Sequence, residues 1–233
     1  MTRTELNLVC LIVSMVLIVF VGVGVSYRRL HEDDRRPLWI MGCGMGIWLL
    51  MTALAARSSW IQEYDVFPPP AARLLIPSLL LIVGAALSPI GRRLAQGLKW
   101  SELVGFQAFR LPVELILYGF FFEARVPLRM TFAGSNYDVL TAISALILAP
   151  LIWRGFIGVK AVWIWNVAGL GLLINIVVLA VLSAPGGLDR FQIGLVNTLP
   201  FRGPSVWIIF CVLLALFGHL ITFRKLLSSH KPA

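Results

Sequence analysis

Hydrophobic residues dominate this chain in seven runs, which are separated by short stretches rich in charged residues, proline and glycine. A transmembrane helix needs about 20 predominantly apolar residues in succession, and the runs have about that length. The runs cover residues 6–27, 37–57, 73–90, 101–123, 137–154, 160–183 and 204–223. The pattern predicts an all-α fold: a polytopic bundle of about seven transmembrane helices, forming one domain over residues 1–233.

Composition supports a membrane protein. The chain is 59% hydrophobic and 13% charged, with a mean hydropathy of +0.88, whereas a soluble domain has about 25% charged residues. Pro77, Pro112 and Pro150 lie inside three consecutive runs and predict kinked helices. The first run is too long for a signal-peptide core, and Arg28 and Arg29 follow it instead of preceding it. It is therefore predicted to be a permanent helix.

Basic residues between the runs predict the orientation in the membrane. Twelve Lys and Arg residues fall on one side of the predicted bundle and seven on the other, leaving out Arg110, which lies within a run. Because the cytoplasmic side carries the excess, we expect the N-terminus outside and the C-terminus in the cytoplasm. Charge in short clusters at helix ends explains the net charge of +9 without a nucleic-acid partner. The connection at 91–100 is one of the short cytoplasmic ones.

The fourth run carries a polar stripe through the predicted membrane. Arg110 and Glu114 are four residues apart, so they share a helix face and are expected to pair. Gln107 and Tyr118 extend the stripe by one turn on either side. Ionisable groups at this depth are costly and usually face protein or a wet cavity. The stripe is either a ligand site or an internal salt bridge that fixes helix packing.

The predicted outer loops are long and chemically mixed. They cover 57–73, 123–138 and 183–204, and the first contains the stiff run Pro68-Pro69-Pro70. We expect them to pack over the mouth of the bundle, with a cavity beneath that reaches the stripe. Asn136 and Asp138 have two readings: they cap the fifth helix, or they join Glu123 and Arg129 in a site.

Other chemistry is sparse. Cys10, Cys43 and Cys211 are isolated, which is not a metal or disulfide pattern. No catalytic triad or phosphate-binding motif is evident, and no metal or cofactor is predicted. Asn166 and Asn175 fall on opposite faces of one helix, so one is expected to bond to a neighbouring helix and the other elsewhere.

Several short motifs carry a resemblance to a known group. They are Phe109-Arg110-Leu111-Pro112-Val113-Glu114, Pro127 with Met130-Thr131-Phe132, Asn136-Tyr137-Asp138, Leu173-Ile174-Asn175-Ile176-Val177, Leu182-Ser183-Ala184-Pro185, Asn197-Thr198 and Leu199-Pro200-Phe201. Over roughly residues 105–225 the chain resembles a group of bacterial polytopic integral membrane proteins with no assigned activity. The resemblance implies a multi-pass protein of the bacterial cytoplasmic (inner) membrane.

Three classes of function remain. The preferred one is binding or transport of a small molecule or lipid through an outward-facing pocket. The alternatives are a seven-helix sensor or accessory subunit, and an intramembrane enzyme with Glu114 or Asp138 as acid–base. Partners would be the lipid bilayer, a small-molecule or lipid ligand, and a membrane-protein partner or a second copy. The candidate ligand-binding residues are Gln107, Arg110, Glu114, Tyr118, Glu123, Arg129, Asn136 and Asp138.

Overall fold

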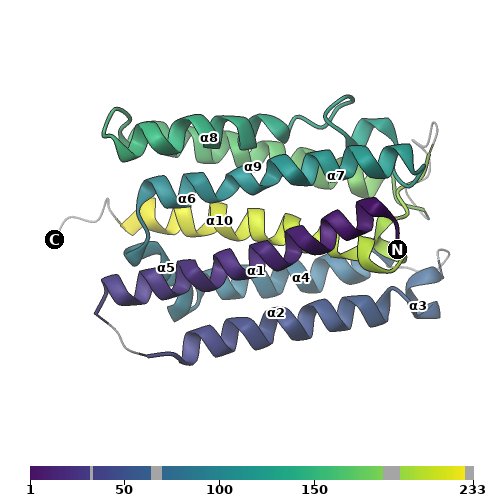
Figure 1. Ribbon diagram of the computed structural model, residues 1–233, viewed down its shortest axis with the longest axis horizontal. Helices are drawn as coiled ribbons and strands as arrows, with labels where there is room; N and C mark the ends of the chain where they lie inside the picture. Colours follow the sequence, from purple (N-terminus) through teal and green to yellow (C-terminus); the bar gives the residue numbers. More distant parts are fainter. Residues whose placement is uncertain (32–33, 64–69, 186–194, 229–233) are drawn as a thin grey trace.

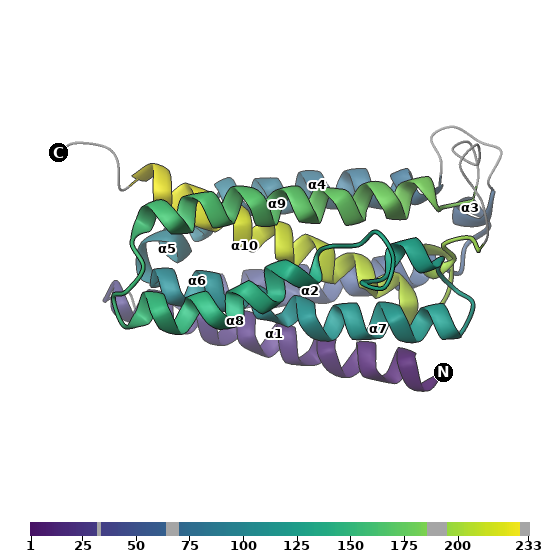
Figure 2. The same ribbon diagram turned by 90° about the horizontal axis from the view of Figure 1, so that it is seen from above.

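The computed structural model describes residues 1–31, 34–63, 70–185 and 195–228, and every regular element in these ranges is helical. Figures 1 and 2 show the helices running side by side along one bundle axis. The α-helices are α1 (Arg3–Arg29), α2 (Arg36–Ala55), α3 (Ser59–Gln62), α4 (Pro70–Leu87), α5 (Pro89–Gly97), α6 (Trp100–Phe106), α7 (Arg110–Phe122), α8 (Val139–Trp153), α9 (Val159–Leu182) and α10 (Ile208–Ser228). The 3-10 helices are η1 (Gln107–Phe109), η2 (Leu128–Met130), η4 (Leu199–Phe201) and η5 (Pro204–Trp207).

The predicted all-helical fold is confirmed, and so is the presence of several helices apolar enough to span a membrane. Five helices of the described residues are long and apolar enough to cross, or six if the bent pair α4 and α5 forms one span. Helix α8 is apolar but has only 15 residues. In Figure 1, α1 begins at one end of the bundle and α10 finishes at the other. The count of seven crossings and the orientation stay predictions.

The segment between α4 and α6 corrects one expectation. It is not a simple connection. The chain bends by 60° between α4 and α5, and α5 packs on α1 and α10. The Ser88 side chain caps α5 by accepting a hydrogen bond from the Gly91 amide, and Pro89 fits the first helical position. Leu94 and Ala95 lie on the apolar face of α5 and are buried in the bundle. An amphipathic helix therefore lies where a short basic loop was predicted.

The helix that carries the polar stripe changes its winding in the middle. Residues 100–122 form one apolar helical span, but η1 interrupts its α-helical geometry between α6 and α7. Pro112 has no amide hydrogen to donate to the Ala108 carbonyl, and its ring crowds that carbonyl. The tighter 3-10 turn relieves this crowding. Arg110 follows this turn directly, as the first residue of α7.

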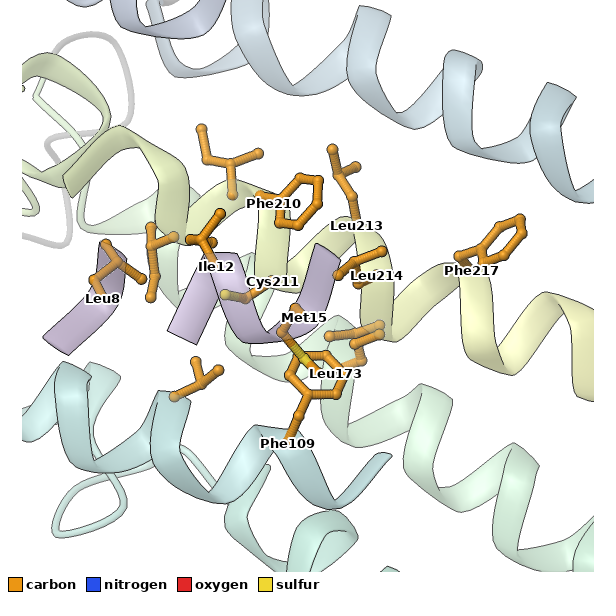
Figure 3. Packing of buried hydrophobic residues seen from close by; sticks show 14 of the residues in the cluster. Leu8, Ile12, Met15, Phe109, Leu173, Phe210, Cys211, Leu213, Leu214 and Phe217 are labelled. Atoms are coloured by element: carbon orange, nitrogen blue, oxygen red, sulfur yellow. The ribbon is translucent and has the colours of Figure 1, made fainter. Parts of the chain in front are cut away.

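Helix α10 forms the centre of the bundle. Two-thirds of its membrane-length window is buried (67%), against 11% for α2 at the edge. Figure 3 shows Phe210, Cys211 and Leu214 of α10 among side chains of α1, η1 and α9. Functional groups on α10 are therefore enclosed by protein, whereas most of the α2 surface remains open to the surroundings.

The connection between α7 and α8 is folded against the bundle. Val126, Met130 and Asn136 are each at most 3% exposed. The loop is braced by its own hydrogen bonds and by Asn175 of α9, whose Nδ2 donates to the Ser135 carbonyl at 2.9 Å. Gly134 is required here, because an added Cβ would lie 2.3 Å from the Leu128 carbonyl oxygen. The predicted packing of loop 123–138 is thus observed. Pro68, Pro69 and residues 186–194 of the other two loops lie outside the described residues.

Candidate polar site inside the bundle

Arg110 and Asp138 form a buried ion pair between α7 and the residue that precedes α8. The Arg110 Nε donates to Asp138 Oδ2 at 2.6 Å, and its Nη2 donates to Oδ1. Arg110 is 2% exposed and Asp138 4%. A fork-to-fork contact of this kind is the strongest geometry for an arginine and a carboxylate. The prediction that Arg110 pairs with Glu114 is therefore wrong, although its burial was anticipated.

Glu114 has an amide partner instead. Asn136 Nδ2 donates to Glu114 Oε2 at 2.6 Å and to the Met130 carbonyl at 3.1 Å, while Asn136 Oδ1 accepts the Asp138 amide at 3.0 Å. One asparagine thus holds the carboxylate and shapes the loop. Of the two readings of these loop residues, helix capping by the Asp138 side chain is not observed. Instead, both side chains hydrogen-bond to residues of α7, Asn136 to Glu114 and Asp138 to Arg110.

His219 links the ion pair to α9. Its Nε2 lies 3.0 Å from Arg110 Nη1, and its Nδ1 lies 2.8 Å from Asn166 Oδ1. Asn166 Nδ2 donates to the His219 carbonyl at 3.2 Å. Because arginine can only donate, Nε2 must accept, so Nδ1 carries the proton and donates to Asn166. This assignment gives a neutral histidine in one tautomer.

The polar network is defined as the six residues Arg110, Glu114, Asn136, Asp138, Asn166 and His219. It joins α7, the α7–α8 loop, α9 and α10, and each member is at most 4% exposed. The pattern of the fourth run identified Arg110 and Glu114, and the loop pattern identified Asn136 and Asp138. His219 and Asn166 were not among the candidates. A single histidine in the middle of an otherwise apolar helix was the available signal.

The other candidate residues lie around the network. Gln107 is buried and donates to the Ala215 carbonyl at 3.0 Å, and its Oε1 has no partner among the described residues. Tyr118 stacks among Phe121, Phe122 and Phe132. Glu123 accepts a hydrogen bond from the Thr2 hydroxyl at 3.1 Å. These contacts place Tyr118 and Glu123 in other clusters. Arg129 is partly buried and falls in η2.

A cavity of about 90 Å³ adjoins the network. Arg110, Glu114 and Asp138 form one part of its wall, and Leu173, Ile176, Val177, Ala180, Cys211 and Val212 are among the residues that form the rest. Met130, Asn197, Leu199 and Pro200 line it on the side of the loops. The cavity is mostly apolar with a few convergent polar groups, which is the usual character of a small-molecule site. Across the described residues, no three His, Cys, Asp or Glu side chains gather as metal ligands.

The fold and the network together define a class: an all-helical protein with membrane-length apolar helices and a buried polar centre. The chain belongs to the family described as "Domain of unknown function (DUF8737)", which it matches over residues 70–227, more than half of its length. The matched range contains α4 to α9, all but the last residue of α10, and the whole polar network. No curated protein and no solved structure gives a significant match.

Proposed function

We propose that this protein is a multi-pass protein of the bacterial inner membrane that binds a small and largely apolar molecule. The stronger version of the proposal is that the protein also transports this molecule. The supporting observation is the cavity of about 90 Å³ in which otherwise apolar walls meet Arg110, Glu114 and Asp138. Typical pockets for drug-sized ligands measure about 300–1,000 Å³. The ligand that fits without rearrangement is therefore only a few heavy atoms in size, or is the end group of a longer molecule.

The location of the cavity supports entry from the predicted outer side. Two of the residues that line it, Met130 and Leu199, belong to the loops at the end of the bundle where α1 begins. With the N-terminus outside, as the basic residues predict, the cavity faces outward. The ion pair and Glu114 then lie at the inner end of the site.

A thermal-shift experiment with small alkyl probes tests this proposal. Butylamine, butanol and butyrate share an apolar tail and differ in the head group. A ligand that binds only the native state stabilises it by RT ln(1 + [L]/Kd), so the unfolding temperature rises with the logarithm of ligand concentration above Kd. We expect at least one of the three probes to raise the unfolding temperature of the purified protein in detergent, with this dependence on probe concentration.

Two variants of α9 make the experiment specific to the cavity. Ala180 lines the cavity, so Ala180→Phe places a benzyl group in it and should abolish the shift. Ile174, on the same helix, is 55% exposed, so Ile174→Phe should leave the shift unchanged. If no probe stabilises the parent protein, or if both variants respond like the parent, the cavity is not a binding site.

A further inference from the structure

The charges around the cavity are not balanced by the protein. Arg110 is neutralised by the bidentate contact with Asp138. Glu114 lines the same cavity, and no basic group of the described residues makes an ion pair with it. Its Oε2 accepts a hydrogen bond from Asn136, whereas no donor to Oε1 is found in the described part of the chain. Only uncharged groups therefore hydrogen-bond to this carboxyl group.

Helix α10 supplies no compensating charge. His219 accepts a hydrogen bond from Arg110 and donates one to Asn166, so both ring nitrogens are satisfied in the neutral form. His219 does not line the cavity itself, and the titratable group that α10 contributes to the wall is the Cys211 thiol. A thiol can lose a proton but cannot become positive. Neither group can neutralise Glu114.

The remaining walls are uncharged as well. Helix α9 contributes Leu173, Ile176, Val177, Ala180 and Val181, and α4 contributes Leu75. Asn197, Leu199 and Pro200 come from the segment between α9 and η5. Burying a charge without a partner costs several kcal/mol. Glu114 must accordingly carry a proton when the cavity holds no cation, or be ionised against a cation that enters the cavity.

We infer that the cavity takes a small lipophilic cation of the alkylammonium type in exchange for the proton on Glu114. This inference rests on the proposed function, because it names the substrate class of the same cavity. In the exchange, the O–H bond of the Glu114 carboxyl group breaks and its proton leaves to water. An ammonium N–H then donates to the freed carboxylate, and the alkyl tail packs against the α9 side of the cavity. One positive charge enters and one leaves.

Glu114→Gln is the informative variant. An amide keeps an oxygen that can accept the hydrogen bond from Asn136, and it imitates the protonated acid in shape and charge. If the cation-free protein holds Glu114 as the acid, the variant should fold with an unfolding temperature at or above that of the parent. It cannot release a proton and cannot neutralise a cation.

Calorimetric titration with butylamine, butanol and butyrate tests the exchange. We expect butylamine to bind more tightly than the other two probes, and Glu114→Gln to weaken butylamine binding roughly 10- to 100-fold in Kd, the range for a hydrogen bond to a charged group. Butanol binding should be unchanged in the variant. Titration in two buffers of different ionisation enthalpy should reveal about one proton released per butylammonium in the parent and none in Glu114→Gln.

The direction in which the Kd of butylamine changes with pH is a further test. The proton on Glu114 competes with the cation for the same carboxylate. As the pH rises, the Kd of butylamine should therefore fall about tenfold per pH unit, over the range in which Glu114 of the unliganded protein is protonated and the amine is charged. Butanol or butyrate binding as tightly as butylamine, or no released proton, overturns the inference and leaves the binding cavity in place. Absence of binding by all three probes overturns the proposed function itself.

Discussion

Arg110 finds its counter-charge in Asp138, 28 residues further along the chain, although Glu114 is on the next turn of its own helix. The 3-10 turn before Arg110 and the folded α7–α8 loop together bring the two groups into fork-to-fork contact. Glu114 instead accepts a hydrogen bond from Asn136, which lies two residues before Asp138. The loop therefore supplies both partners of the polar stripe.

The Arg110 and Asp138 side chains should depend on each other for their burial. Removing one member strands a buried charge, so Arg110→Leu or Asp138→Leu alone should lower the free energy of unfolding by about 3–5 kcal/mol. The double variant should recover much of this loss, because two apolar side chains leave no stranded charge. Chemical unfolding in detergent micelles, analysed as a double-mutant cycle, measures the coupling. Additive losses would show that the two residues do not act as a pair.

Gly169 should be needed to seat the His219 ring. An added Cβ would lie 2.8 Å from His219 Cε1 and 3.0 Å from Thr141 Cγ2. Gly169→Ala should therefore push the ring away from Arg110 and cost about 1–3 kcal/mol, as overpacking does. Gly171→Ala is the matched control on the same helix, since no atom lies within 4 Å of its added Cβ. The control should be neutral or slightly stabilising in thermal unfolding. Equal losses of stability in the two variants would mean that α9 does not tolerate alanine at either position, and that contact with His219 is not the cause.

Glu5 and Glu102 make the same kinds of contact but differ in burial, so they show how burial changes the stability contribution of an ion pair. Glu5 and Glu102 each accept a hydrogen bond from the amide three residues earlier, and each pairs with an arginine, Arg125 and Arg29 respectively. Side-chain exposure is 11% for Glu5 and 35% for Glu102. Glu5→Gln should cost about 3–5 kcal/mol because Arg125 stays buried without its partner. Glu102→Gln should cost at most about 1 kcal/mol. Similar unfolding temperatures for the two variants would contradict this ranking.

The orientation can be tested with cysteines in a background that lacks the three native ones. Ser59 of α3 is exposed at the end where α1 begins, and Phe156, between α8 and α9, is 75% exposed. We expect Ser59→Cys to react with an impermeant thiol reagent applied outside, and Phe156→Cys to react only after permeabilisation. A reporter fused after Lys231 should be cytoplasmic. Reaction of Phe156→Cys from outside would show that α8, with its 15 residues, does not cross.

The sequence predicted helices better than it predicted contacts. Long apolar runs such as 160–183 form helices, which is the conformation expected where no water is present to hydrogen-bond the backbone. Asn166 and Asn175 do bond to different neighbours, as their angular separation requires. The Arg110–Glu114 pairing was wrong because the four-residue rule is local, whereas the competing partner comes from a loop. The geometry of that loop depends on tertiary contacts.

His219 escaped prediction for a related reason. Its role follows from Arg110, on a helix that is 109 residues away in sequence, and from Asn166 on a third helix. No spacing pattern within a single helix encodes such a contact. The same holds for α5, whose apolar face is short and whose charged residues resemble a loop. Residues that act across helices become visible only when the bundle is assembled.

The wide sequence separation of the partners of Arg110 has a consequence for biosynthesis. At a translation rate of about 5–20 residues per second, the ribosome makes Asp138 roughly 1–6 seconds after Arg110, and His219 roughly 5–20 seconds after it. In the membrane protein proposed above, the arginine-bearing helix must wait during that interval at the translocon or the membrane surface, since its charge has no partner in the lipid. Lateral release of this helix is therefore expected to follow the arrival of Asp138, so that the nascent chain enters the bilayer as a group of helices and not one helix at a time.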